Sequence, residues 1–368
     1  MTKHDSTTYR SAGVDYDLLD AGKRQAILAA LGTSAFALAR GGESLDASRG
    51  EPAFVMTVGG LQLALVIECL GTKSILTREY EEATGVNRFD WIGYDTVAAI
   101  VNDICAVGAL PLMMSAYFAT GSPEWYAAPG RFDALVSGWR RGCEDSGAVW
   151  GGGESPMLSG IVEPGEIDLG GCAVGIIPTG RPPLLGDRLQ PGDEIVFVES
   201  TGLQTNGASL AREVARRAGG LAQKLPSGQT LGDTLLAPSA IYVKLVEALY
   251  AADTPLSYMT PITGHGLRKL MRADRQLCYR VTKLPEVSEV FTYITDILAL
   301  SPAEAYGTFN MGAGFALFCP RGEGERAVTV ATDQGYKAYL GGRVEEGPRS
   351  VVLEPVGVSF DEGELRLR

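Results

Sequence analysis

Residues 93–103, with the sequence GYDTVAAIVND, form the segment that most restricts how this chain can fold. In this segment and the two residues after it, apolar residues recur at the spacing of one face of an α-helix, at Val97, Ile100, Val101, Ile104 and Cys105. Asp95 and Asn102 share a different face, and Asp95 lies near the expected helix start, where a carboxylate is favoured. Two alternatives follow: a helix cap with a solvated polar face, or a site for a metal ion with phosphate, since hard cations prefer carboxylate and amide oxygens.

The length and charge of the chain restrict its organisation and its partners. A chain of 368 residues favours two domains over one. A formal net charge of −12 argues against nucleic acid and anionic membranes as general partners, because both bind basic surfaces. Small phosphorylated substrates stay compatible, since a nest of backbone N–H groups and a few cations is enough to bind phosphate.

The cysteines and histidines argue against a structural zinc site. The six cysteines include no CxxC pair, and the two histidines are His4 and His265. Scattered thiols, together with an N-terminus that has no apolar signal core, indicate a cytoplasmic protein. The most apolar window, residues 54–71, is interrupted by Gly59-Gly60, which favours two strands and a tight turn over a membrane span.

Strand-like and helix-like segments are mixed in both halves of the chain, which predicts an α/β (α+β) fold. In the first half, helices are expected at residues 17–40 and 129–146, and strands at 111–120, 149–154 and 170–177. In the second half, strands are expected at 194–198 and 315–319, and helices at 208–220, 239–251 and 267–272. The densest cluster of chain-breaking residues, 178–183, divides an N-terminal domain, residues 1–178, from a C-terminal domain, residues 179–368.

Two glycine-containing loops of the first half carry groups suited to phosphate or cations. Residues 68–73, ECLGTK, offer backbone N–H groups and the Lys73 ammonium, although the GxxxxGK[ST] spacing of a P-loop is absent. In residues 151–155, GGGES, the glycines allow a backbone to approach a ligand, and Glu154 is able to bind Mg²⁺ or act as a base. A plain glycine-rich turn is the alternative for the second loop.

Two loops of the second half precede helices. Residues 200–207 place hydroxyls, an amide and free N–H groups at a helix N-terminus, which suits an anion, with a well-capped helix as the alternative. In residues 263–266, His265 stands between glycines, where it is able to contact a substrate or shuttle a proton. A structural role is the alternative for this lone histidine.

In this order the segments resemble one family, the aminoimidazole ribonucleotide synthetases (phosphoribosylformylglycinamidine cyclo-ligases) of the PurM superfamily. The likeness covers most of the chain in collinear order. Its motifs are YRSAGVD at 9–15, GTK at 71–73, IGYD at 92–95, VND at 101–103, GALP at 108–111, YFATG at 117–121, GGES at 152–155, GLQTNG at 202–207, ITG at 262–264 and TFNMGAG at 308–314.

The resemblance implies a PurM-like two-domain fold, a homodimer whose N-terminal domains meet through their strands, and an ATP-dependent ring closure. ATP would activate the formyl amide oxygen of formylglycinamidine ribonucleotide, and an internal nitrogen would attack the formyl carbon. It implies Mg²⁺ on Glu68, Asp95 and Asp103, and catalytic roles for Asp95, Glu154 and His265. The ATP-binding residues would be Glu68, Gly71, Thr72, Lys73, Asn102, Asp103, Gly152 and Gly153. The substrate-binding residues would be Gly202, Thr205, Asn206, Gly207, Thr263, Gly264 and Asn310.

The sequence departs from the family pattern at several motif positions. Glu68 stands where the family has Asp, and both family histidines are replaced, by Gln204 and Pro261. His265 occupies a glycine position of the family, which makes it the candidate to replace a lost imidazole. Two alternatives therefore stay open: a paralogue that uses ATP to activate or phosphorylate a different small metabolite, and a regulatory or binding subunit without catalysis. The retained acidic residues and glycine loops argue against the second.

Overall fold

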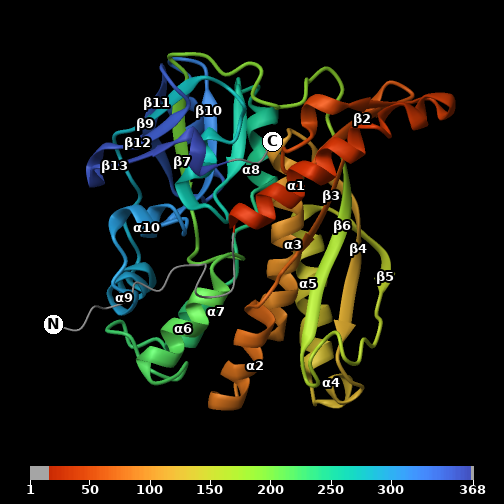
Figure 1. The fold of residues 1–368 in the computed structure, drawn as a ribbon, viewed down its shortest axis with the longest axis vertical. Helices are drawn as coiled ribbons and strands as arrows, with labels where there is room; N and C mark the ends of the chain where they lie inside the picture. The colour runs from red at the N-terminus through yellow and green to blue at the C-terminus, as the bar shows by residue number, and fades with distance from the viewer. Residues whose placement is uncertain (1–15, 366–368) are drawn as a thin grey trace.

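Residues 16–365, the part of the chain that this computed structural model describes, form two β-sheets with helices packed against them (Figure 1). The first sheet has the strand order β1-β2-β3-β6-β4-β5, and the second has the order β13-β12-β9-β11-β7-β10-β8. Within each sheet neighbouring strands are antiparallel, except β4 beside β5 and β12 beside β9. The predicted α/β (α+β) class is confirmed, whereas the YRSAGVD motif and His4 lie outside the described residues.

The bounds of the elements follow the chain. The strands are β1 Gly42–Leu45, β2 Phe54–Val58, β3 Leu61–Cys69, β4 Leu110–Thr120, β5 Val149–Glu154, β6 Ile167–Ile176, β7 Glu194–Glu199, β8 Tyr258–Pro261, β9 Leu277–Val281, β10 Ala313–Cys319, β11 Ala338–Glu346, β12 Ser350–Leu353 and β13 Val358–Asp361. The α-helices are α1 Tyr16–Leu31, α2 Lys73–Thr84, α3 Phe89–Ala106, α4 Glu124–Ala127, α5 Arg131–Ser146, α6 Ala208–Ala218, α7 Leu231–Leu236, α8 Val243–Ala251, α9 Glu289–Leu298, α10 Pro302–Tyr306 and α11 Gly324–Asp333.

The apolar window at residues 54–71 forms the hairpin that the sequence predicts. Phe54 of β2 pairs with Leu65 of β3, and Gly59 and Gly60 make the turn with positive φ angles of 57° and 84°. Among residues 16–365, no helix is long and apolar enough to cross a membrane.

Helix α3 lies at the centre of the molecule and starts earlier than its sequence pattern indicates. It begins at Phe89 rather than near Gly93, because the fully buried Phe89 and Ile92 extend its apolar face toward the N-terminus. Asp95 is therefore in the second turn and does not cap the helix, so the predicted position near the helix start is wrong. α3 packs against α5, and Figure 1 shows both helices against one face of the first sheet.

Other predicted helices differ from the structure at their ends. The helix expected at 17–40 breaks at Gly32-Thr33 into α1 and a 3-10 helix, Ser34–Arg40. The helix expected at 239–251 starts only at Val243, because residues 239–242 form no regular structure and their backbone bonds to α3. The basic helix expected at 267–272 is a 3-10 helix, Gly266–Met271.

One hydrophobic core joins the two sheets. It includes Ile104 of α3, Ala173 of β6, Val196 of β7 and Phe315 of β10, all buried. The first sheet ends at Ile176 and the second begins at Glu194. The domain boundary between residues 178 and 179 stays a prediction about folding units.

Candidate active site

Two adjoining cavities lie between the halves of the molecule, and together we call them the interdomain cleft. The first, of about 80 Å³, is lined by residues of both halves, among them Asn102 and Thr205. The second, of about 530 Å³, adds His265, Lys269 and Arg272 to the lining. Four residues line both cavities: Glu68, Asp103, Asn206 and Thr263. The cleft thus brings together two acidic residues of the first half and two of the predicted substrate-binding residues of the second.

The acidic side of the cleft consists of Glu68, near the end of β3, and Asp103, in the last turns of α3. Burial and the neighbouring Glu68 carboxylate raise the pKa of Asp103 well above its ordinary value. Two adjacent carboxylates disfavour their joint ionisation, and a cation between them relieves that repulsion. This pair is therefore suited to binding a cation.

The basic side of the cleft consists of Lys269 and Arg272, to which the sequence analysis gave no role. Lys269 is only 8% exposed, and burial together with Arg272 lowers the pKa of its ammonium group. Arg272 donates to the carbonyl oxygen of Gly50 at 3.0 Å and lies 3.8 Å from a carboxylate oxygen of Glu51. The basic segment at residues 267–272 was the available signal, but sequence alone did not show that it faces Glu68 and Asp103.

Lys73 and Asp95 form an ion pair in which both side chains are fully buried. The Lys73 ammonium also donates to the carbonyl oxygen of Gln204 at 2.7 Å. The other oxygen of Asp95 accepts from the backbone N–H of Ser239 at 2.6 Å. Both oxygens of Asp95 are therefore bound to protein groups, so the structure separates it from Glu68 and Asp103, with which the sequence analysis grouped it.

Asn102 binds the same stretch of the second half. Its amide donates to the carbonyl oxygen of Ala240 at 2.9 Å and accepts from the N–H of Tyr242 at 2.9 Å. The polar face of α3 that carries Asp95 and Asn102 is thus buried against the second half of the molecule. The alternative of a solvated face is wrong, because Asp95 is 0% and Asn102 only 7% exposed.

The loop at residues 200–207 enters the cleft with Thr205 and Asn206. The buried Asn310 holds this loop from behind, since its amide donates to the carbonyl oxygen of Gly202 at 2.9 Å and accepts from the Ser200 hydroxyl at 2.9 Å. Gly207 has a φ of 90°, and a Cβ there would meet the Phe309 ring at 2.6 Å. Gly202, Gly207 and Asn310 therefore shape the loop, while its two polar side chains line the cleft.

Several residues predicted to bind ATP, and the predicted catalytic residue Glu154, lie outside the two cavities. Gly71 has a φ of 66°, and Thr72 bridges the halves through its hydroxyl, 3.1 Å from that of Ser209. Gly152, Gly153 and Glu154 are exposed on the edge strand β5, where the Glu154 carboxylate accepts from the N–H of Ser155 at 3.2 Å. Neither cavity is lined by any of these five residues.

Comparisons with known proteins decide the family. The model described as AIR synthase related protein, N-terminal domain, matches residues 50–177, and that of the C-terminal domain matches residues 190–354. This chain belongs to the AIR synthase related family.

Relatives named phosphoribosylformylglycinamidine cyclo-ligase match most of the chain. The one from Sorangium cellulosum is 34% identical over 350 residues, which cover 92% of this chain and 95% of the relative. Identity to the one from Rippkaea orientalis is 35% over 291 residues, with 77% of this chain and 83% of the relative covered. The Pyrococcus furiosus relative is 30% identical over 354 residues, with 96% and 99% covered.

Solved structures share the fold at lower identity. Hydrogenase maturation protein HypE in complex with ATP superposes with a TM-score of 0.60 at 20% identity, covering 81% of this chain and 83% of that one. Thiamine monophosphate kinase from Aquifex aeolicus superposes with a TM-score of 0.56 at 18% identity, covering 81% and 90%. The predicted PurM-like fold is confirmed.

His265 shows how this member of the AIR synthase related family accommodates a departure from the family motif. Its φ of 73° is in the left-handed region, which suits the glycine that the family pattern has at this position. The side chain is 4% exposed, and burial with the nearby Lys269 lowers its pKa to about 2. The imidazole is therefore neutral near pH 7, and its predicted catalytic role stays a prediction.

Proposed function

We propose that this member of the AIR synthase related family is an ATP-dependent cyclo-ligase that converts formylglycinamidine ribonucleotide into aminoimidazole ribonucleotide. The relatives that match along most of the chain are named for this activity. The structural observation that carries the proposal is the interdomain cleft, in which Glu68 and Asp103 of one half lie with Lys269 and Arg272 of the other.

The reaction proceeds in two chemical steps. The γ-phosphoryl group of ATP is transferred to the formyl amide oxygen, and ADP leaves. The internal amidine nitrogen then forms a bond to the formyl carbon, the carbon–oxygen bond breaks, and phosphate leaves with that oxygen while a proton is lost. Phosphoryl transfer depends mainly on positioning and on cations that neutralise developing charge. Arg272 supplies a fixed positive charge in the cleft, and Lys269 adds a second one in its protonated form.

Glu68 and Asp103 are the residues that would hold Mg²⁺. Among the described residues, no group of three or more His, Cys, Asp and Glu side chains is placed to hold a metal ion. Two carboxylates are nevertheless sufficient, because Mg²⁺ is commonly bound by one or two carboxylates together with substrate phosphates. Bound Mg²⁺ would neutralise negative charge that develops on the phosphate groups during transfer. Asp95 is not included in this set, because its role is to hold Lys73.

The cleft also divides the roles of the predicted substrate-binding residues. Thr205, Asn206, Thr263 and Gly264 line it and are proposed to contact the ribonucleotide. We propose that Gly202, Gly207 and Asn310 act by shaping the loop that presents them. His265 lines the same cavity as a neutral imidazole, which is able to donate or accept one hydrogen bond.

The test is an assay with purified protein, ATP, Mg²⁺ and formylglycinamidine ribonucleotide. Formation of the imidazole product with one ADP per product supports the proposal. Binding or turnover of ATP without the imidazole supports the alternative, a paralogue that acts on a different metabolite. Absence of nucleotide binding supports a regulatory subunit and contradicts both enzymatic functions.

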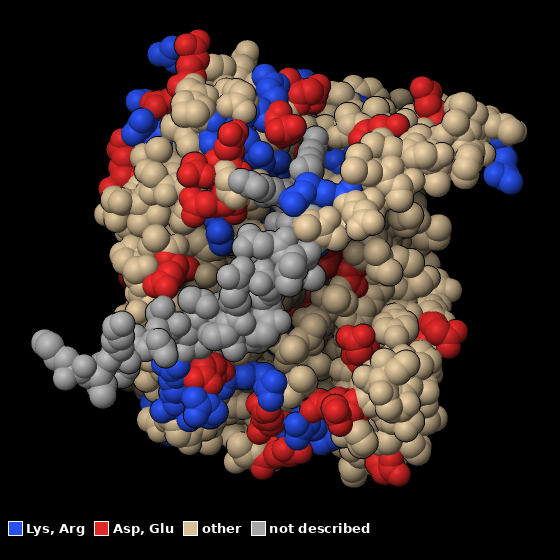
Figure 2. Space-filling view, viewed as in Figure 1, with Lys and Arg blue, Asp and Glu red and all other residues tan. Residues whose placement is uncertain are grey.

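We further propose that two copies of the chain meet through the outer face of the first sheet, in the cytoplasm. A row of apolar side chains crosses this face, with Leu65 of β3 opposite Val174 of β6, Val174 opposite Met113 of β4, and Met113 opposite Val149 of β5. Ile67, one pleat further along, is 79% exposed. Figure 2 shows few charged side chains at the right, where Figure 1 draws β4, β5 and β6. Such a face is typical of a protein interface.

The dimer is tested by measuring molar mass in solution. The wild-type chain is expected at twice 38.9 kDa, and Ile67→Asp is expected to shift it toward the monomer. Ile161→Asp, at a residue 81% exposed in a loop, is the matched control and is expected to leave the mass unchanged. A monomeric wild-type chain would contradict the proposal.

A further inference from the structure

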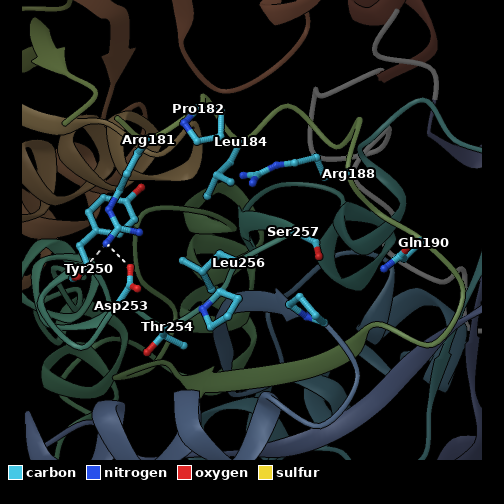
Figure 3. A pocket seen from close by; sticks show the side chains of 12 residues that line it. Arg181, Pro182, Leu184, Arg188, Gln190, Tyr250, Asp253, Thr254, Leu256 and Ser257 are labelled. Atoms are coloured by element: carbon cyan, nitrogen blue, oxygen red, sulfur yellow. Dashed lines mark hydrogen bonds and ion pairs between the residues drawn. The ribbon is translucent and has the colours of Figure 1, made fainter. Parts of the chain in front are cut away.

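A separate cavity lies beside the segment that connects the two sheets (Figure 3). Residues 181–190 line one side and residues 250–257 line the other. Its volume is about 380 Å³, within the range of small-molecule sites, and none of its lining residues lines the interdomain cleft. We call it the linker cavity.

The linker cavity contains two arginines in different situations. Arg181 is held in place: its guanidinium donates to the carbonyl oxygen of Tyr250 at 2.8 Å and to Asp253 at 3.1 Å, and lies 4.4 Å from the Tyr250 ring centroid. Arg188 is exposed, and no residue within 16–365 forms a hydrogen bond or ion pair with it. Figure 3 shows its side chain extending across the cavity toward Leu184. Arg188 is thus a cation that faces the cavity without a counter-ion in the described part of the chain.

The net charge of the residues that line the linker cavity is opposite in sign to that of the chain as a whole. The charged residues that line the cavity are Arg181, Arg188 and Asp253, so the lining is net positive in a chain with a formal net charge of −12. Both arginines also act on the Tyr250 hydroxyl, since each opposes the rise in its pKa that burial causes. A local positive potential in an acidic protein concentrates anions at this place.

The remainder of the lining combines polar residues, such as Gln190 and Ser257, with an apolar part. Leu184 and Leu256 are buried, and three prolines join them: Pro182, Pro255 and Pro320. The hydroxyl of Thr254, a residue only 1% exposed, has no hydrogen-bond partner among the described residues. A buried hydroxyl without a partner is destabilising.

We propose that the linker cavity binds a small organic anion, with its carboxylate or phosphate on Arg188 and an apolar body against Leu184 and Leu256. A guanidinium binds either head group through two parallel hydrogen bonds. The apolar body is included because Leu184, Leu256 and the three prolines form a hydrocarbon part of the lining that a bare anion would leave uncovered.

Both walls of the linker cavity are attached to the C-terminal end of α3. The N–H of Leu184 donates to the carbonyl oxygen of Val107 at 3.0 Å, and the Tyr250 hydroxyl donates to that of Gly108 at 2.8 Å. α3 carries Asp103 into the interdomain cleft one turn earlier. A ligand that joins the two walls therefore stiffens the segment that fixes this end of α3, and it is expected to slow amide hydrogen exchange in residues 181–190.

The binding test uses phenyl phosphate and benzoate as probes, with isothermal titration calorimetry on the full chain. Arg188→Gln is expected to weaken binding of the accepted probe at least tenfold. Arg140→Gln removes the same charge from an exposed arginine of α5 and is expected to change affinity less than twofold. Equal affinity of both variants, or no binding of either probe to the wild type, would overturn the proposal.

The probes also distinguish the head group and the place of binding. Binding of phenyl phosphate alone identifies a phosphate site, and binding of both probes identifies a general anion site. Inorganic phosphate is expected to bind at least tenfold more weakly than phenyl phosphate. Equal affinity of the two would show that the ligand needs no apolar body and would overturn that element of the proposal. If Lys269→Gln abolishes binding of the probe while Arg188→Gln leaves its affinity unchanged, the probe binds in the interdomain cleft, and the proposal is overturned. These measurements do not depend on the proposed cyclo-ligase activity.

Discussion

Asp95 and Asp103 lie on the same helix, α3, but differ in their partners and in whether they face a cavity. Burial raises the pKa of both carboxyl groups. Asp95 is fully buried and has a cation, Lys73, and a backbone N–H as partners. Asp103 faces a second carboxylate, Glu68, in a cavity. The Asp95 carboxylate is thus neutralised by groups of the protein itself. The Glu68–Asp103 pair instead holds negative charge that a bound cation is able to neutralise.

This difference shows how one helix serves two purposes in the molecule. The face of α3 with Asp95 and Asn102 fastens the second half of the chain to the first. The edge with Asp103 opens into the interdomain cleft. Stability and catalysis should therefore respond separately to changes at the two aspartates.

The largest effect is expected from Asp95→Asn. Removing the carboxylate leaves the fully buried ammonium of Lys73 without a counter-ion, which should lower the free energy of unfolding by about 3–5 kcal/mol. Urea denaturation measures it. Replacing both partners, Lys73→Met with Asp95→Leu, should recover most of the loss. Glu144→Gln, which breaks an exposed pair with Arg140, should cost less than about 1 kcal/mol. A loss below about 1 kcal/mol for Asp95→Asn would show that the pair does not fasten the halves.

Asp103→Asn should show the opposite pattern. It removes half of the proposed Mg²⁺ site, and kcat for ring closure should fall by about 100-fold or more. Its free energy of unfolding at pH 7 should stay the same or rise, because a carboxyl group with a raised pKa is less stable ionised in the folded chain. Steady-state kinetics and urea denaturation measure the two quantities. Asp90→Asn is the control for activity: Asp90, like Asp103, is a half-buried residue of α3, and it pairs with Arg141 of α5 away from the cleft. Full activity of Asp103→Asn would remove this residue from the proposed site.

His265 should make the folded chain sensitive to acid. Its folded pKa of about 2 lies below that of an unfolded histidine, about 6.5, so the unfolded chain binds the proton more readily. Stability from the neutral imidazole is complete above pH 6.5 and is lost as the pH falls toward 2. Between pH 7 and pH 5 the loss should be about 2 kcal/mol.

The acid effect is measured by comparing His265→Asn with the wild type in urea denaturation at both pH values. Asparagine is chosen because it tolerates the positive φ at this position. The variant should lose about 2 kcal/mol less than the wild type over this interval. Identical losses in both proteins would show that His265 is not buried in solution. A fall in turnover of more than about tenfold would support its predicted role in catalysis.

The smallest effect is expected from Asn102→Ala. It leaves the carbonyl oxygen of Ala240 and the N–H of Tyr242 without their partner, at a cost of about 1–2 kcal/mol. Thermal or urea denaturation measures it, with Gln223→Ala as an exposed control that should have almost no effect. Because no charge is left unpaired, the loss should be smaller than for Asp95→Asn. A larger loss would show that Asn102 contributes more to stability than the Lys73–Asp95 pair.

Local patterns were sufficient for most of the fold. The spacing of apolar residues predicted α3, and the double glycine between apolar runs predicted the β2–β3 hairpin. Each of these signals depends on neighbours within a few residues, because a helix or a hairpin satisfies its own backbone. Helix ends were less predictable: α8 starts late because residues 239–242 bind α3, which no local pattern records.

The order of the motifs along the chain determined the family, and with it the expectation of an acidic site near Glu68 and Asp103. Tertiary structure alone decided which residues share that site. Asp95 lies only eight residues before Asp103, yet its partners come from positions 73 and 239. Lys269 and Arg272 face the acidic pair from the other half of the chain. Burial and charge pairing arise between segments far apart in sequence, so a residue's chemistry was readable from the sequence but its partners were not.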